Sequence, residues 1–123
     1  MERFAHFVHE EIVMPVFITY ASYSNAGVKG MLKKPENRTG PVAALLEKVG
    51  GKLLAFYVTT GSNDVVVISE APDGTDAVAV GMAVAASGAV SRVETVRAWS
   101  ADEFVAITEK AAKLVAAYTP PGG

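Results

Sequence analysis

Polar side chains that could bind a ligand alternate with apolar ones in two stretches that we expect to be β-strands. Successive residues of a strand point to opposite faces of its sheet, so this alternation sorts the side chains by face. If helices cover the apolar set, the other face carries Tyr57 with Thr59 and Thr95 with Arg97. Arginine pairs with carboxylates and tyrosine offers a hydroxyl, so the four residues predict a site for a polar or anionic small molecule.

These residues also have a structural interpretation. Arg97 can instead pair with Glu70 or Glu94 on a neighbouring strand while Tyr57 fills an interface. Asp64, in the turn 61–64, could act as a base at the mouth of a cavity. Aspartate in a tight turn more often accepts hydrogen bonds from backbone N–H groups, and both interpretations stay open.

The N-terminal residues His6, His9 and Glu10 are spaced so that one face of a helix could offer them to a metal. A zinc-protease motif needs a different spacing and a third ligand, so we expect a solvated extension, no metal site and no cofactor. A basic cluster around the first expected helix break either binds an anion or forms a solvated face: Lys29, Lys33, Lys34 and Arg38.

Composition excludes several classes of protein. The chain has no cysteine, which removes disulfides, thiolate nucleophiles and zinc–thiolate sites. Its formal charge of −2 leaves no positive excess for a phosphate backbone, so we expect no nucleic-acid partner. The longest uncharged stretch, 77–90, is shorter than the roughly 20 residues of a membrane helix. We expect neither a membrane span nor an export signal, and a cytoplasmic location.

The order of elements predicts an α+β fold. β-branched and aromatic runs predict strands at 16–22, 52–60, 65–71 and 92–99, while apolar periodicity and capping residues predict helices at about 28–32, 41–49, 73–87 and 100–117. This order indicates a ferredoxin-like βαββαβ unit with an additional C-terminal helix and a four-stranded antiparallel sheet. We expect the domain at 14–117, an extension at 1–13 and a flexible tail at 118–123.

The expected third strand carries apolar residues on both of its faces, from Val65 to Ile68. Helices cover only one face of such a sheet, so a second copy of the chain is the expected cover for the other. The stretch 77–86 has no charge on any side of its helix, which favours burial all round. We therefore expect a homodimer or a larger homo-oligomer.

Short motifs between Met14 and Leu114 point to a known family: the Tyr20 and Tyr23 strand, Gly50-Gly51-Lys52, Phe56-Tyr57-Val58-Thr59 with Gly61 and Asp64, Glu70-Ala71-Pro72-Asp73, and Thr95-Val96-Arg97-Ala98-Trp99. In these motifs the chain resembles the GYD domain family, small bacterial proteins named for a glycine, a tyrosine and an aspartate at the central hairpin. Asn63 stands at the namesake tyrosine. The resemblance implies a dimeric α/β barrel, in which two ferredoxin-like sheets pack face to face, sometimes around a ligand cavity.

Three functions fit these expectations. The first is a small-molecule-binding oligomer with its site between facing sheets. The second is a cofactor-independent enzyme of the dimeric-barrel type, an oxygenase or isomerase acting on a small hydrophobic metabolite. The third is a purely structural oligomer with a filled interface.

Overall fold

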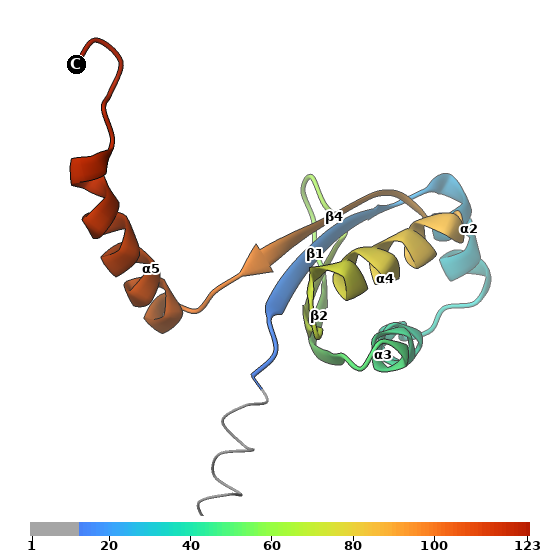
Figure 1. Ribbon diagram of the computed structural model, residues 1–123. Helices are drawn as coiled ribbons and strands as arrows, with labels where there is room; N and C mark the ends of the chain where they lie inside the picture. Colours follow the sequence, from blue (N-terminus) through green and yellow to red (C-terminus); the bar gives the residue numbers. More distant parts are fainter. Residues whose placement is uncertain (1–12) are drawn as a thin grey trace, which may run out of the picture.

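The computed structural model describes residues 13–123 and shows one antiparallel sheet with helices packed against one side (Figure 1). The strands are β1 (Val16–Tyr23), β2 (Lys52–Val58), β3 (Val65–Glu70) and β4 (Val90–Ala98). The helices are α2 (Asn25–Lys33), α3 (Thr39–Lys48), α4 (Gly74–Ala86) and α5 (Ala101–Leu114), and α5 ends in a 3₁₀ turn, Val115–Ala117. The expected order of elements is therefore confirmed. His6, His9 and Glu10, for which we expect a solvated extension and no metal site, lie outside the described residues.

The sheet has the strand order β2-β3-β1-β4, and every neighbouring pair is antiparallel. The two central strands, β1 and β3, are joined through a crossover that contains α2, α3 and β2. This is the ferredoxin-like βαββαβ arrangement followed by a C-terminal helix, as the sequence predicts. β4 and β2 form the two edges.

Local sequence explains where the helices begin. The side chain of Asp73 accepts hydrogen bonds from the first turn of α4, and the side chain of Asp76 accepts one from the Asp73 backbone N–H. Ser100 and Glu103 form the same reciprocal capping box at the start of α5. Gly50 ends α3 with a positive φ of 79°, a conformation that other residues adopt at a cost.

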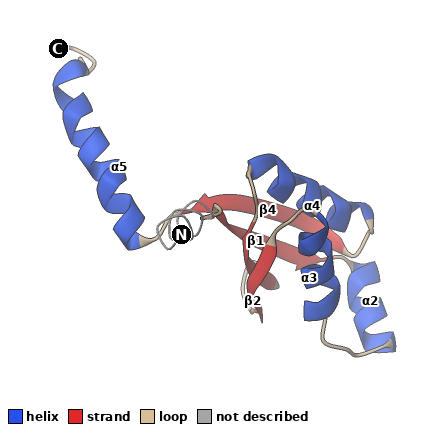
Figure 2. Ribbon diagram, turned by 60° about the horizontal axis from the view of Figure 1, so that its bottom comes forward, coloured by secondary structure: helices blue, strands red, loops and turns tan. Residues whose placement is uncertain are grey.

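Helices α3 and α4 cover one face of the sheet (Figure 2). The residues of β1 that point toward them are Phe17, Thr19, Ala21 and Tyr23. Phe17 is buried with Ala71 and Ala77 in the small core, and Leu46 of α3 is 3% exposed. The helix layer thus provides the apolar cover that holds the sheet in place.

The opposite face of the sheet has no cover from the described residues of the chain. We call it the open face and define it by its apolar side chains: Ile18, Tyr20, Tyr57, Val66, Ile68 and Val96. Of these, Tyr57 is 61% exposed and Val96 is 38% exposed. The expectation that this sheet is apolar on both sides is confirmed within the single chain.

Helix α5 extends away from the sheet and covers neither of its faces (Figures 1 and 2). Phe104, Val105 and Leu114 are each more than half exposed. No helix among residues 13–123 combines the length and apolarity needed to cross a membrane.

The N-terminal end of α2 lies against the turn between α4 and β4, and this contact gives a stability test. The Ser24 N–H donates to the Ala89 carbonyl over 3.0 Å, and a Cβ on Gly27 would collide with that carbonyl. Gly30, in the same helix, has open space around its missing side chain.

We expect Gly27→Ala to lower the free energy of unfolding by about 1–3 kcal/mol through overpacking. Gly30→Ala, the matched control, is expected to raise it by up to about 1 kcal/mol, because alanine favours the helix. Urea denaturation of both variants measures the difference. Equal effects would contradict the close approach of α2 to Ala89.

Candidate functional site

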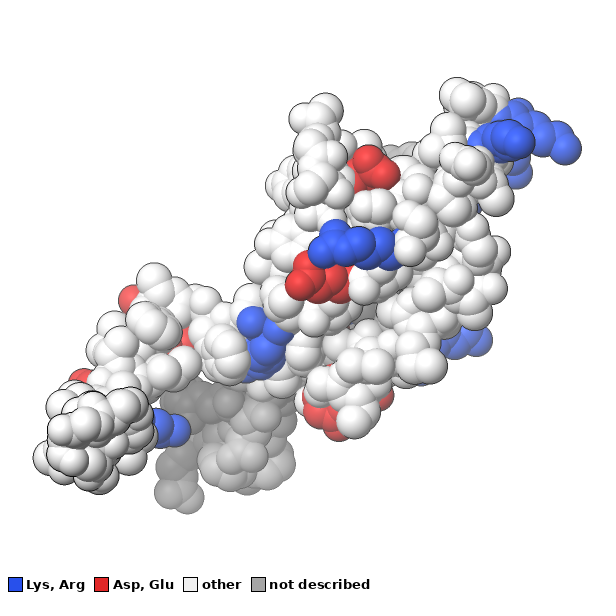
Figure 3. All heavy atoms as spheres, turned by 90° about the horizontal axis from the view of Figure 1, so that it is seen from above, with Lys and Arg blue, Asp and Glu red and all other residues white. Residues whose placement is uncertain are grey.

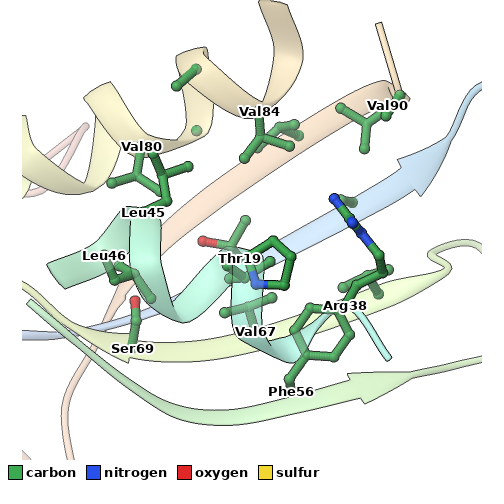
Figure 4. Close-up of a pocket in the computed structure, with 18 of the residues that line it drawn as sticks. Thr19, Arg38, Leu45, Leu46, Phe56, Val67, Ser69, Val80, Val84 and Val90 are labelled. Carbon is green, nitrogen blue, oxygen red and sulfur yellow. The ribbon is translucent and has the colours of Figure 1, made fainter. Parts of the chain in front are cut away.

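A cavity of about 300 Å³ lies between the helix layer and the sheet. Its walls are mainly apolar and come from α3, α4 and all four strands. Figure 4 shows Leu45 and Leu46 of α3, Val80 and Val84 of α4, and Phe56 and Val67 of the sheet around it. Such walls favour an apolar ligand, because apolar surface gains free energy when it leaves water.

A few hydroxyl groups interrupt these walls. Thr19 of β1 lines the cavity, and its Oγ1 lies 3.0 Å from that of Thr95 of β4, which lines the neighbouring groove between α4 and β4. Ser69 of β3 is only 4% exposed and also lines the cavity. In Figure 4 Thr19 and Ser69 point into the space below the helices. They offer a ligand a small number of oriented hydrogen-bonding groups.

Arg38 lies at one end of the cavity, away from Leu46 and Ser69 (Figure 4). It directly precedes α3, and its side chain is 46% exposed, so this end is open to solvent. Its Nη1 donates to Glu36 Oε2 over 2.6 Å. This hydrogen bond lowers the pKa of Glu36, which Lys34 lowers further. A guanidinium has five N–H donors, so the pair with Glu36 leaves donors for a ligand.

Tyr23 lines the same cavity and connects it to the central hairpin. Its backbone N–H donates to Asp64 Oδ2 over 2.9 Å, and the Asp64 N–H donates to the Ala21 carbonyl over 2.8 Å. Burial raises the pKa of the Tyr23 phenol; the negative charge of Asp64 raises it further, and the positive charge of Arg38 lowers it. The phenol therefore stays neutral over a wider range of pH than an exposed tyrosine does.

The predicted placement of Thr95 and Arg97 away from the helices is wrong. Thr95 pairs with Thr19, and Arg97 pairs with Phe17, so both point toward the helix layer. The prediction assigned the apolar residues Val96 and Ala98 to the helix side. Both faces of this sheet are apolar, so apolarity alone could not tell one face from the other.

The predicted ion pair between Arg97 and Glu70 or Glu94 is also wrong. Arg97 donates instead to the backbone carbonyls of Val16 and Ala98. Its guanidinium lies 4.5 Å from the ring centre of Trp99 and 5.8 Å from that of Phe17. Arg97 thereby holds the C-terminal end of β4 against the start of β1 through backbone hydrogen bonds and cation–π contacts.

The other predicted site residues, Tyr57, Thr59 and Asp64, do not lie in one place. Tyr57 points to the open face, as expected. Thr59 closes the hairpin, where its N–H donates to the Asp64 carbonyl over 2.8 Å and its hydroxyl to the Asn63 carbonyl over 2.7 Å. Asp64 accepts a backbone N–H, which agrees with its structural interpretation. The structure therefore does not bring Tyr57, Thr59, Thr95, Arg97 and Asp64 into one site, and their role in ligand binding stays a prediction.

The structure separates the predicted basic cluster into three lysines at α2 and Arg38 at the cavity. Lys29 and Lys33 belong to α2 and Lys34 follows it, and Figure 3 shows basic side chains gathered at that end of the molecule. Arg38 alone among them lines the cavity.

Sequence reasoning missed Thr19, Tyr23 and Ser69 as cavity residues, although their alternation with Ile18, Tyr20 and Ile68 is visible in the sequence. Within residues 13–123 no three His, Cys, Asp or Glu side chains gather so that they could hold a metal ion.

The electrostatics of Tyr23 can be tested by titration. We expect Asp64→Asn to lower the pKa of Tyr23 and leave it above the ordinary value of 10.0, because burial is the largest cause of the shift. Arg38→Gln, which removes the opposing charge, is expected to raise it. Phenol absorbance against pH, with Tyr23→Phe subtracted, isolates this group. The neutral phenol's contribution to stability persists below pH 10 and declines as pH rises through the raised pKa. Identical titrations in all variants would contradict the arrangement.

The comparisons with known proteins agree with this architecture. The family model of the GYD domain matches residues 17–108, from β1 into α5. No curated protein matches the chain. The matched segment includes the four strands apart from the first residue of β1, the helices that cover them and the first half of α5. The chain belongs to the GYD domain family.

Proposed function

We propose that this protein binds a small molecule that is mostly apolar and carries one anionic group. The observation that supports the proposal is the cavity between the helix layer and the sheet, with its apolar walls and the Arg38 guanidinium at its open end. The apolar part of the ligand fills the space beside Val67 and Val80. Its anionic group meets Arg38 and the hydroxyl of Tyr23.

The groups around the cavity favour binding over turnover. Among the described residues that line it, none is Asp, Glu or His, and the polar groups are hydroxyls and one guanidinium. Arginine cannot lose its proton in a protein, and hydroxyls need a neighbouring base before they act as nucleophiles. This composition suits a ligand that is held without being changed.

The proposal includes self-association through the open face. Ile18, Val66 and Ile68 lie side by side across β1 and β3, and their exposure to water in a single chain is unfavourable. The open face of a second copy has the same width and the same apolar character, so two sheets can cover each other around a twofold axis. Tyr57, at the margin, would then meet the partner.

Ligand binding can be tested with decanoate, an apolar chain with one carboxylate, and with decanol as its uncharged counterpart. We expect the wild-type protein to bind decanoate, and Arg38→Gln to weaken that binding by about tenfold, because a charge-assisted hydrogen bond is lost. Decanol binding is expected to be unchanged by Arg38→Gln. Isothermal titration calorimetry measures both ligands.

A second variant separates the cavity from the protein surface. Val80→Phe places a larger side chain in the cavity wall and is expected to weaken decanoate and decanol alike. Lys29→Gln, on the exposed side of α2, is the control for lost positive charge and is expected to bind as the wild type does. Decanoate binding that survives Val80→Phe, or that Lys29→Gln reduces as much as Arg38→Gln, would contradict the proposed site.

Self-association through the open face has its own test. Tyr57→Glu places a carboxylate in the proposed interface, where it would lose its hydration without a partner. We expect the particle mass from light scattering to fall to half that of the wild type. Tyr118→Glu, at a residue that is 69% exposed and follows α5, is the matched control and is expected to keep the wild-type mass. An unchanged mass in Tyr57→Glu would exclude this interface.

A further inference from the structure

Strand β4 is an edge of the sheet and one of its longest strands. It pairs with β1 on one side, and none of the described residues pairs with its other side. Its nine residues therefore present a row of free backbone N–H and C=O groups, which can pair with another strand. The other edge, β2, has seven residues and an irregular register between Leu53 and Ala55. β4 has an irregularity of its own, because Ser22 pairs with Arg92 and Tyr23 with Val90, which leaves Ser91 without a partner on β1. The stretch from Arg92 to Ala98 pairs regularly with β1 and is longer than either regular part of β2, so it is the better template.

The residues on the two sides of Val93 in β4 form chemically complementary pairs. Reading outward from Val93, Arg92 stands against Glu94, Ser91 against Thr95, and Val90 against Val96. Two copies of one strand that pair in antiparallel fashion around Val93 place these residues directly opposite each other. Each arginine then faces a glutamate. Ser91 is the extra residue of a bulge, so the regular pairing about the axis runs from Arg92 to Glu94.

We propose that β4 is a second self-association surface, where β4 of another copy adds in antiparallel register with Val93 opposite Val93. An interface around a twofold axis must be complementary to itself, and this register meets that requirement from Arg92 to Glu94, in the regular part of β4. The result is one continuous eight-stranded sheet. The partner is a second copy of this chain.

The charges on β4 fit this partner. Arg92 Nη2 lies 3.2 Å from Glu94 Oε1 of the same chain, and both side chains are 52% exposed. Arg92 Nη1 donates to Asn63 Oδ1 over 2.7 Å. A guanidinium has five N–H donors, so Arg92 keeps donors for the Glu94 carboxylate of the other copy. Two arginines and two glutamates then alternate around the axis, and cross-strand pairs of opposite charge stabilise a sheet.

Helix α4 supplies a second, independent reason. It packs beside β4, and its side chains Val78 and Met82 are 55% and 68% exposed. A groove of about 340 Å³ runs between it and β4, lined by Met82, Ala85, Val90 and Val93 among others. A twofold axis perpendicular to the sheet keeps both helix layers on one side, so the two α4 helices approach each other over this groove. The absence of charge along α4 after Asp76 suits that contact.

The backbone edge of β4 is distinct from the open face, although Arg92 and Glu94 pair with Ser22 and Tyr20, so their side chains stand on the open-face side of the sheet. The open face lies above the plane of the sheet, whereas the β4 edge lies within that plane. One copy can therefore use both surfaces at once. The proposed ligand lies between the helix layer and the sheet, so neither self-association test decides the ligand proposal.

Two opposite charge variants test the register. Arg92→Glu gives each β4 two acidic residues, and Glu94→Arg gives each two basic residues. Either variant alone puts four like charges around the axis, so we expect each to have half the particle mass of the wild type and a dissociation constant raised by about tenfold or more. An equimolar mixture again faces each glutamate with an arginine. Its mass is expected to return to that of the wild type.

The mixture is the decisive measurement, because an ion pair within one chain cannot be restored by adding another chain. Circular dichroism checks that both variants fold, which their exposed positions favour. A wild-type mass in either single variant would overturn the proposal, as would a mixture that stays at the reduced mass or a wild-type protein that is monomeric at the concentrations used. A mass that falls in Tyr57→Glu and stays constant in Arg92→Glu would assign all self-association to the open face.

Discussion

The structure depends on one constraint: both faces of the sheet are apolar, and the helices among residues 13–123 cover only one of them. Phe17, Ala21 and Val65 are buried because α3 and α4 lie over them. Ile18, Val66 and Ile68, on the same strands, have no such cover from the described chain. Free energy from burial is thus only partly realised in a single copy, and the open face follows from this one fact.

The strand order and the helices could be predicted because local signals agree with the global fold. Gly50-Gly51 ends one helix, Asp73 and Ser100 begin two others, and the turn 61–64 joins β2 to β3. Each signal acts within a few residues, so it is readable without knowledge of the rest. The faces of β4 were not readable in this way. Thr95 and Arg97 point to the helices because of the register with β1, which depends on residues about 80 positions away.

The candidate cavity shows the same limit of local reasoning. Its hydroxyls come from separate strands, and Thr19 meets Thr95 only after the sheet has formed. Arg38 appears in the sequence as one member of a basic cluster with Lys29, Lys33 and Lys34. The break between α2 and α3 separates it from the lysines and turns it toward the sheet. Asp64 shows the opposite case, because its type in a turn already indicated a bond to backbone N–H.

Helix α5 is joined to β4 by only Trp99 and Ser100, yet it projects from the domain with its apolar side chains in water. A helix of 14 residues is marginally stable in water when nothing packs against it, even with a good cap at its start. Its helical content in solution therefore serves as a gauge of its surroundings. Slow amide hydrogen exchange along α5 would mean that another protein surface packs against this helix. Rapid exchange would mean that nothing packs against it.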